Sequence, residues 1–155
     1  MIEIDIAINE GNWAGEGELQ ALSKNAIEAA TLHLEEQLPD GAEVSLLFTD
    51  DAQMQSLNKD WREQDKPTNV LSFAANEGDG PDTPLLGDII LAFETVKREA
   101  DEQRKPFEHH LTHLIIHGFL HLLGYDHIDD DEAEQMELLE TKLLAGLEIS
   151  DPYLS

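Results

Sequence analysis

The chain contains no cysteine, which excludes a disulfide framework and a thiolate metal site. Any metal chemistry must therefore rely on imidazole and carboxylate side chains. No apolar run reaches membrane-spanning length, and the N-terminal stretch 1–8 lacks the basic region of a signal peptide. These absences predict a soluble cytoplasmic protein with no membrane-spanning segment.

Basic residues are also scarce. Nine Lys and Arg stand against 34 Asp and Glu, for a formal net charge of -25, and such a charge repels polyanions at long range. Taken alone, this argues against nucleic-acid binding. Most of the basic residues nevertheless fall in two short stretches, Lys59, Arg62 and Lys66, then Lys97, Arg98, Arg104 and Lys105. The sequence leaves open whether these are binding patches or ion pairs on helix surfaces.

Hydrophobic periodicity indicates the fold class. The length of 155 residues suits one domain, spanning 1–155, with a substantial core. Apolar residues alternate in the first strand and recur at helical spacing in the segment that follows. Strands are expected at 2–8, 44–49, 70–73 and 85–93, and helices at 18–38, 50–61, 94–103, from Pro106 onward and after the acidic stretch 129–132. This order predicts an α+β domain whose sheet, mixed and of about four strands, has helices packed on it.

Three histidines near the C-terminal end form the most informative pattern. His117 and His121 are four residues apart, so on a helix they point two ring nitrogens at a common spot. Gly124 can adopt the left-handed conformation that ends a helix, which would fold His127 back toward the first two. The pattern predicts a three-histidine metal site at a helix end with an open position, as in catalytic zinc sites. One Zn²⁺ per chain is expected, although imidazole also accepts nickel, copper or iron.

The remaining histidines are weaker candidates. His113 extends the stripe of His117 and His121, but the outer pair would lie roughly 12 Å apart along the helix, too far to share one ion. His113 is therefore expected either to support a ligand or to be an ordinary helix histidine. His109 and His110 are interpreted as surface residues with no role.

The histidine spacing matches that of metzincin-type zinc peptidases, with one departure. Those enzymes carry a glutamate directly after the first histidine as the general base. Here that position is Gly118. A peptidase of the usual kind would lack its base, so this function is the weakest alternative.

Several motifs together resemble the YbeY endoribonuclease family of bacterial rRNA maturation factors. They are the histidine motif 117–127, the stretches 57–62 and 65–73, and Leu86-Gly87-Asp88-Ile89, all in family order. The resemblance implies a single α+β domain, zinc at His117, His121 and His127, and an arginine, Arg62, lining the same cleft. It also implies single-strand-specific RNA cleavage in rRNA maturation, including processing of the 16S rRNA 3′ end and ribosome quality control. Precursor rRNA and ribosome or small-subunit assembly proteins are the implied partners.

A mechanism can be outlined from these residues. His117 carries the catalytic metal, and Arg62 would clamp the phosphate and stabilise added negative charge. Asp126 could orient a ligand histidine or relay protons, or simply form a turn. Lys59 and Lys66 could bind the RNA backbone beside Arg62, and Asp88 either faces the cleft or serves a strand-end turn. The sequence does not choose between activation of a water and use of the RNA 2′-hydroxyl, and it leaves a non-catalytic assembly factor with a fold-organising zinc as the main alternative.

Overall fold

Four strands form one mixed sheet in the computed structural model, which describes residues 2–9, 13, 15–34, 41–63, 68–74, 85–125 and 130–149. Their order across the sheet is β1-β2-β4-β3. The strands are β1 (Glu3–Ile8), β2 (Glu43–Thr49), β3 (Val70–Ala74) and β4 (Leu85–Ala92). The pairs β1-β2 and β2-β4 are parallel, whereas β3 runs antiparallel to β4 and forms one edge of the sheet.

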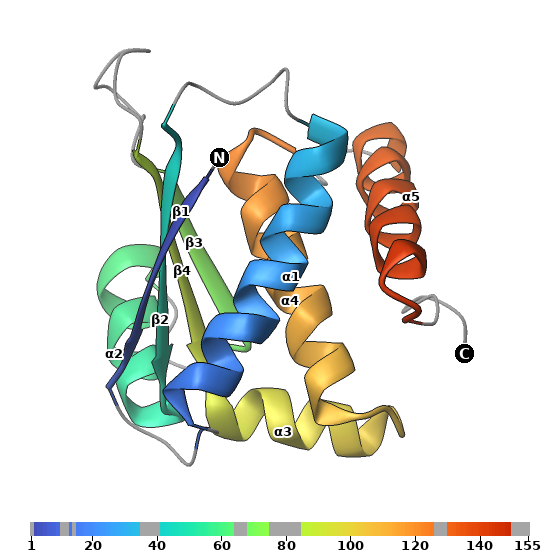
Figure 1. Cartoon of the computed structure of the whole chain (residues 1–155). Coiled ribbons are helices and arrows are strands. Elements are labelled where there is room, and N and C mark those ends of the chain that lie inside the picture. The colour runs from blue at the N-terminus through green and yellow to red at the C-terminus, as the bar shows by residue number, and fades with distance from the viewer. Residues whose placement is uncertain are drawn as a thin grey trace.

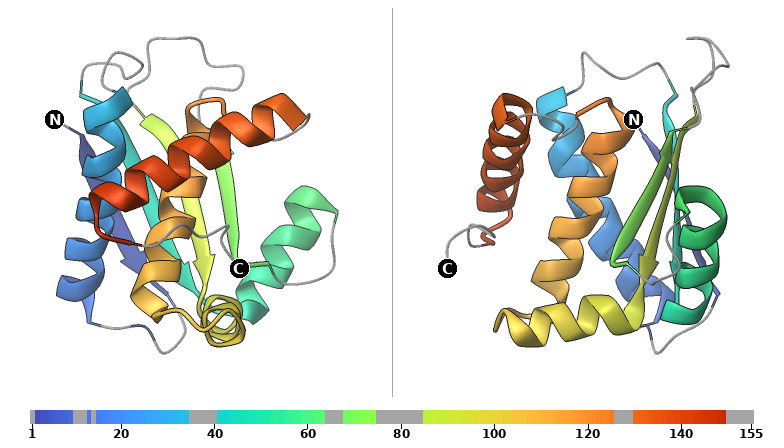
Figure 2. Two further views of the ribbon diagram at one scale, coloured as in Figure 1. Left: turned by 90° about the vertical axis from the view of Figure 1, so that its right-hand side faces the viewer. Right: turned by 180° about the vertical axis from the view of Figure 1, so that it is seen from behind.

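The described ranges also contain five helices, which cover the two faces of this sheet unequally (Figures 1 and 2). They are α1 (Glu16–Leu34), α2 (Asp51–Arg62), α3 (Phe93–Glu102), α4 (Phe107–Leu122) and α5 (Asp130–Gly146). Helix α2 lies on one face, while α1 and α4 lie on the other and α3 crosses one end of it. Helix α5 packs on α1 and α4, on the side away from the sheet.

Two hydrophobic clusters follow from this arrangement. The larger lies between the sheet and the α1–α4 layer and includes Ile27, Phe48, Ile115 and Phe119, all fully buried. The smaller lies under α2 and is built around Met54. Because α4 is surrounded by the sheet, α1, α3 and α5, most of its residues are buried, unlike those of an ordinary amphipathic surface helix.

The predicted order of elements and the α+β fold class with a mixed four-stranded sheet are confirmed. Asp50 caps α2, since its side chain accepts a hydrogen bond from the Gln53 backbone N–H at 2.9 Å. The first helix begins at Glu16, earlier than expected, and its predicted end near Leu38 lies outside the described residues. None of the helices in the described ranges is long and apolar enough to cross a bilayer.

Candidate metal centre

Helix α4 places His117 and His121 on one face, and their rings converge. The Nε2 atoms of the two residues are 3.0 Å apart. The rings meet edge to face, with centroids 4.5 Å apart. The predicted convergence of this i, i+4 pair is thus present in the fold.

The hydrogen bonds of the opposite ring nitrogens determine what the converging atoms can do. His121 Nδ1 lies 2.9 Å from the Tyr125 carbonyl oxygen, which can only accept, so this nitrogen must carry the hydrogen. His117 Nδ1 lies 2.5 Å from Glu140 Oε1 and donates to that carboxylate. In the neutral form of each ring, Nε2 is then left with a lone pair.

Two lone pairs facing each other at 3.0 Å repel unless a cation or a proton lies between them. Two nitrogen ligands on a tetrahedral zinc, with Zn–N bonds of about 2.0–2.1 Å, would be roughly 3.4 Å apart. The observed separation is close to that span. His117 and His121 therefore fit a shared divalent ion that binds through both Nε2 atoms.

The chain turns sharply after these two histidines. Helix α4 ends at Leu122, and Gly124 adopts a φ of 101°, a conformation that glycine adopts readily. The Gly124 N–H donates to the His121 carbonyl oxygen and the Tyr125 N–H to that of Leu120. The glycine turn is confirmed. His127, the predicted third ligand, and Asp126 lie outside the described residues.

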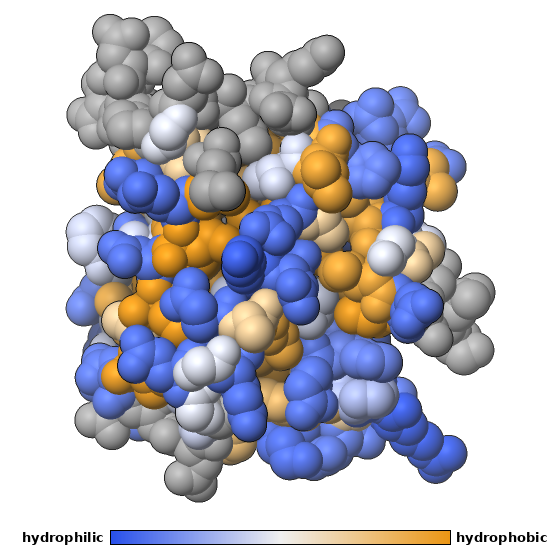
Figure 3. Space-filling model, viewed as in Figure 1, coloured by the Kyte–Doolittle hydropathy of each residue, from blue (hydrophilic) through white to orange (hydrophobic). Residues whose placement is uncertain are grey.

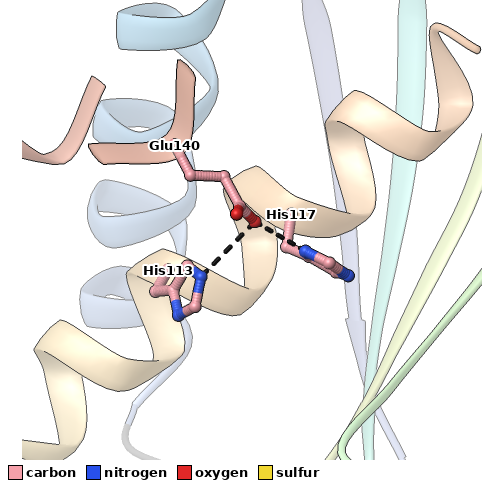
Figure 4. A group of neighbouring side chains, drawn as sticks. All are labelled: His113, His117 and Glu140. Atoms are coloured by element: carbon pink, nitrogen blue, oxygen red, sulfur yellow. Dashed lines mark hydrogen bonds and ion pairs between the residues drawn. The ribbon is translucent and has the colours of Figure 1, made fainter. Parts of the chain in front are cut away.

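An acidic residue that was not predicted from the sequence lies beside this pair. Glu140 belongs to α5, has no exposed side-chain surface, and lies 3.4 Å from His113 Nε2 as well as 2.5 Å from His117 Nδ1. Figure 4 shows its carboxylate pointing at both rings from the neighbouring helix, while the other nitrogen of His117 points away from it. The three residues form a group that could itself hold a cation. A signal was available: Glu140 follows the buried Met136 by four residues on the inward face of α5.

Packing explains why glycine follows the first histidine. A Cβ atom on Gly118 would lie 2.9 Å from Ile89 Cγ2 and 3.2 Å from Ser72 Oγ. The backbone of α4 is thus pressed against strands β4 and β3 at this point. A glutamate, as in the zinc peptidases, has no room here.

Comparison with known proteins identifies the family. The sequence model described as Endoribonuclease YbeY matches residues 6–148. The chain belongs to the YbeY endoribonuclease family. It is 56% identical to Endoribonuclease YbeY of Sinorhizobium fredii, covering 98% of this chain and 92% of that protein, and 54% identical to that of Rhizobium meliloti, covering 98% and 95%. The solution structure of TM1509 from Thermotoga maritima is similar over 100% of both chains, with 27% identity and a TM-score of 0.60.

In this YbeY-family chain, the end of α2 and the helix of the histidine pair contact opposite faces of the edge strand β3. Ser72 of β3 faces Gly118, and the next residue, Phe73, packs against Trp61 with ring centroids 6.1 Å apart. Trp61 is nevertheless 67% exposed. Lys59, on the same helix, is exposed as well. The Arg62 side chain and Lys66 lie outside the described part of the chain.

Asp88 does not face the histidines. On β4 its neighbour Ile89 contacts Gly118 of α4, so the alternation of the strand directs Asp88 to the opposite face, the one that carries α2. Desolvation raises the pKa of the Asp88 carboxyl above its ordinary value. Asp88 is thus adjacent to Phe73, its partner in the β3-β4 pair, rather than part of the metal centre.

The second basic stretch is also remote from the histidine pair. It covers the end of α3 and the turn before α4, whereas His121 lies near the other end of α4, about 20 Å away along the helix. Lys97 forms an i, i+4 ion pair with Asp101 at 3.1 Å. Hydrophilic residues predominate on the face of the molecule in Figure 3, with smaller apolar patches between them.

The interpretation of His110 as a surface residue without a role is wrong. Only 3% of His110 is exposed, because α3 packs over this side of α4. Its Nε2 lies 2.9 Å from Glu99 Oε1, and the same oxygen accepts from the Asn69 side chain at 3.0 Å. Burial raises the pKa of Glu99, but the hydrogen bonds from His110 and Asn69 outweigh it and leave the pKa below its ordinary value. This network joins α3, α4 and the start of β3.

Proposed function

We propose that this chain is a zinc-dependent endoribonuclease that cleaves single-stranded regions of ribosomal RNA precursors in the cytoplasm, including the 3′ end of 16S rRNA. One domain, residues 1–155, would carry the activity. One zinc ion per chain is held by His117, His121 and His127. The observation that supports this most directly is the approach of two Nε2 atoms to 3.0 Å while both Nδ1 atoms are engaged elsewhere.

Each residue of the site has a separate role in RNA cleavage. When bound, a divalent ion supplies Lewis-acid stabilisation of negative charge on the phosphate. Arg62, the last residue of α2, clamps the phosphate through its planar guanidinium group. The Tyr125 carbonyl orients the His121 ring through Nδ1. Asp126 is the candidate for orienting a ligand or moving a proton.

Single-stranded RNA approaches, on this proposal, along the edge strand β3. Lys59, Arg62 and Lys66 supply positive side chains for phosphate contacts, although Asp60, Glu63 and Asp65 lie between them in the sequence. The exposed Trp61 ring offers a surface on which a nucleobase can stack. Trp61 packs on Phe73 and Gly118 faces the preceding residue Ser72, so the two lie on opposite faces of this edge strand. Ribosome or small-subunit assembly proteins are proposed as partners, and a net charge of -25 favours a basic protein surface.

Peptide hydrolysis is not supported. The general base of metzincin-type peptidases would have to replace Gly118, and the contacts with Ile89 and Ser72 leave no space for a larger side chain.

Cleavage of a structured rRNA fragment by zinc-loaded protein tests the proposal. Arg62→Ala and His117→Ala should each lower the rate about 100-fold or more, because the first removes the phosphate clamp and the second a ligand of the ion. Lys24→Ala, which removes an exposed positive charge from α1, is the matched control and should cleave normally. Equal cleavage by all four proteins would indicate a contaminating nuclease. No cleavage by the folded, zinc-loaded wild type would favour the non-catalytic assembly factor.

A further inference from the structure

Glu140 is a carboxylate placed where an apolar residue would be expected. Its side chain is fully buried at the contact of α5 with α4, on a helix face that also buries Met136, Leu143 and Leu144. Burying a carboxylate is unfavourable unless hydrogen bonds or a nearby positive charge compensate. Glu140 therefore points to a requirement other than packing.

Its distances distinguish a hydrogen-bond acceptor from a metal ligand. Glu140 Oε1 and His117 Nδ1 are 2.5 Å apart, shorter even than the about 2.7–2.9 Å of a charge-assisted N–H···O hydrogen bond, so the two atoms are hydrogen-bonded. Two atoms bound to the same ion would lie roughly 3 Å apart or more. His113 Nε2, at 3.4 Å, is a looser neighbour of the same oxygen.

The two ring nitrogens of His117 therefore differ: Nδ1 is a hydrogen-bond donor and Nε2 is the candidate metal ligand. If Nδ1 holds its hydrogen toward Glu140, only Nε2 has a lone pair for an ion, and Nε2 is the atom that faces His121. The reverse tautomer would direct a hydrogen at His121 and block a shared ion. The carboxylate also increases the electron density on the ring and so its affinity for a cation.

We propose that Glu140 is a positioning residue for the metal centre: it fixes the tautomer and orientation of His117 and makes helix α5 part of the site. This inference rests on the proposed zinc site at His117 and His121. It assigns the buried His113-Glu140 contact a supporting role and not that of a second metal site.

The first test compares zinc affinity in two variants of α5, measured by competition with a chelator. Glu140→Gln keeps the size of the side chain but weakens the hydrogen bond, and should bind zinc about 10- to 100-fold more weakly than the wild type. Glu137→Gln removes the same charge from an exposed position three residues earlier and should bind as the wild type does. Unchanged affinity in Glu140→Gln would overturn the proposal.

A second measurement needs no variant and so does not depend on how Glu140→Gln folds. Long-range ¹⁵N–¹H NMR spectra of the zinc-free wild-type protein report which nitrogen of each imidazole carries the hydrogen. In the wild-type protein, His117 should be in the Nδ1–H form. A wild-type His117 in the Nε2–H form would contradict the assigned role.

A third experiment distinguishes residues that bind the zinc from residues that only position a ligand. His113→Leu should still bind one zinc per chain, whereas His117→Ala and His121→Ala should lose it. If His113→Leu and Glu140→Gln both lose zinc as completely as His117→Ala, the ion lies in the His113-His117-Glu140 group and the proposal fails. Wild-type protein that shows the expected affinities and tautomer but no RNA cleavage would refute the proposed function and leave the role of Glu140 intact.

Discussion

At the scale of single residues, the site depends on the hydrogen-bond partner of each histidine nitrogen and on the small size of Gly118. His117 donates through Nδ1 and presents Nε2, while Gly118 has no side chain and lets α4 approach the sheet. The absence of a Cβ at this position places the histidine pair next to β3. The lack of a side chain at Gly118 thus allows α4 to lie close to β3, the strand whose Phe73 packs against Trp61.

Gly118→Ala should destabilise the protein by about 1–3 kcal/mol, since the new Cβ would overpack against Ile89 and Ser72. Urea unfolding followed by circular dichroism measures the change. Gly146→Ala, at the end of α5 with no atom within 4 Å of the new Cβ, is the control and should be neutral or stabilising by up to about 1 kcal/mol. Equal effects at both positions would show that Gly118 is not tightly packed.

At the scale of elements, α4 connects the histidine pair to the sheet and to two other helices. It carries the histidine pair, touches β3 at Gly118, meets α5 at Glu140 and is tied to α3 through the His110-Glu99 contact. The Glu99 network also reaches Asn69, which precedes β3. The strand beside the metal centre is thus fixed at both its start and its middle.

Replacing Glu99 should make the α3–α4 junction less stable and less sensitive to acid. The folded-state pKa of Glu99 lies below its ordinary value of 4.5, so its stabilisation is complete above that value and is lost as the pH falls. Glu99→Gln should lower the unfolding free energy near neutral pH by about 1 kcal/mol or more, with the difference from wild type shrinking toward pH 3. Unfolding curves at several pH values test this, with the exposed Glu102→Gln as control. A constant difference at all pH values would contradict it.

The end of α2 offers a direct test of RNA contact. Trp61→Ala should weaken binding of single-stranded RNA by about 1–3 kcal/mol if one base stacks on the ring. Leu138→Ala, which truncates a side chain 64% exposed on α5, should have no effect. Fluorescence anisotropy of a labelled oligonucleotide measures both. Equal affinities for Trp61→Ala and wild type would remove the stacking role.

At the scale of the whole molecule, the charge distribution limits how RNA can be held. The net charge of -25 opposes a polyanion, and the basic stretch at the end of α3 lies far from the histidine pair. The first stretch, Lys59, Arg62 and Lys66, is the proposed source of phosphate contacts near the site, and the remaining two basic residues, Lys24 and Lys142, stand singly on α1 and α5. Binding must therefore rely on few ion contacts, stacking and the metal centre.

Because few basic residues contact the phosphates, the RNA binding constant should depend only weakly on salt concentration. Three phosphate contacts on a single strand predict a slope of about -2 for the logarithm of the binding constant against that of the salt concentration. The measurement is made on metal-free protein to prevent cleavage, and Lys59→Ala should reduce the slope by about 0.7. A wild-type slope steeper than about -4 would mean that other basic residues bind the RNA.

The sequence by itself determined the family, the order of strands and helices and the histidine pair, because alternation, helical spacing and the i, i+4 relation are local properties of the chain. The turn at Gly124 was predictable for the same reason. The roles of Glu140, Ile89, Ser72 and Glu99 were decided only by the tertiary structure, since these residues come from other strands and helices and act through contacts with α4. The burial of His110 was not predictable from the sequence either, because a helix that is covered on all sides shows no clear division into a buried and an exposed face.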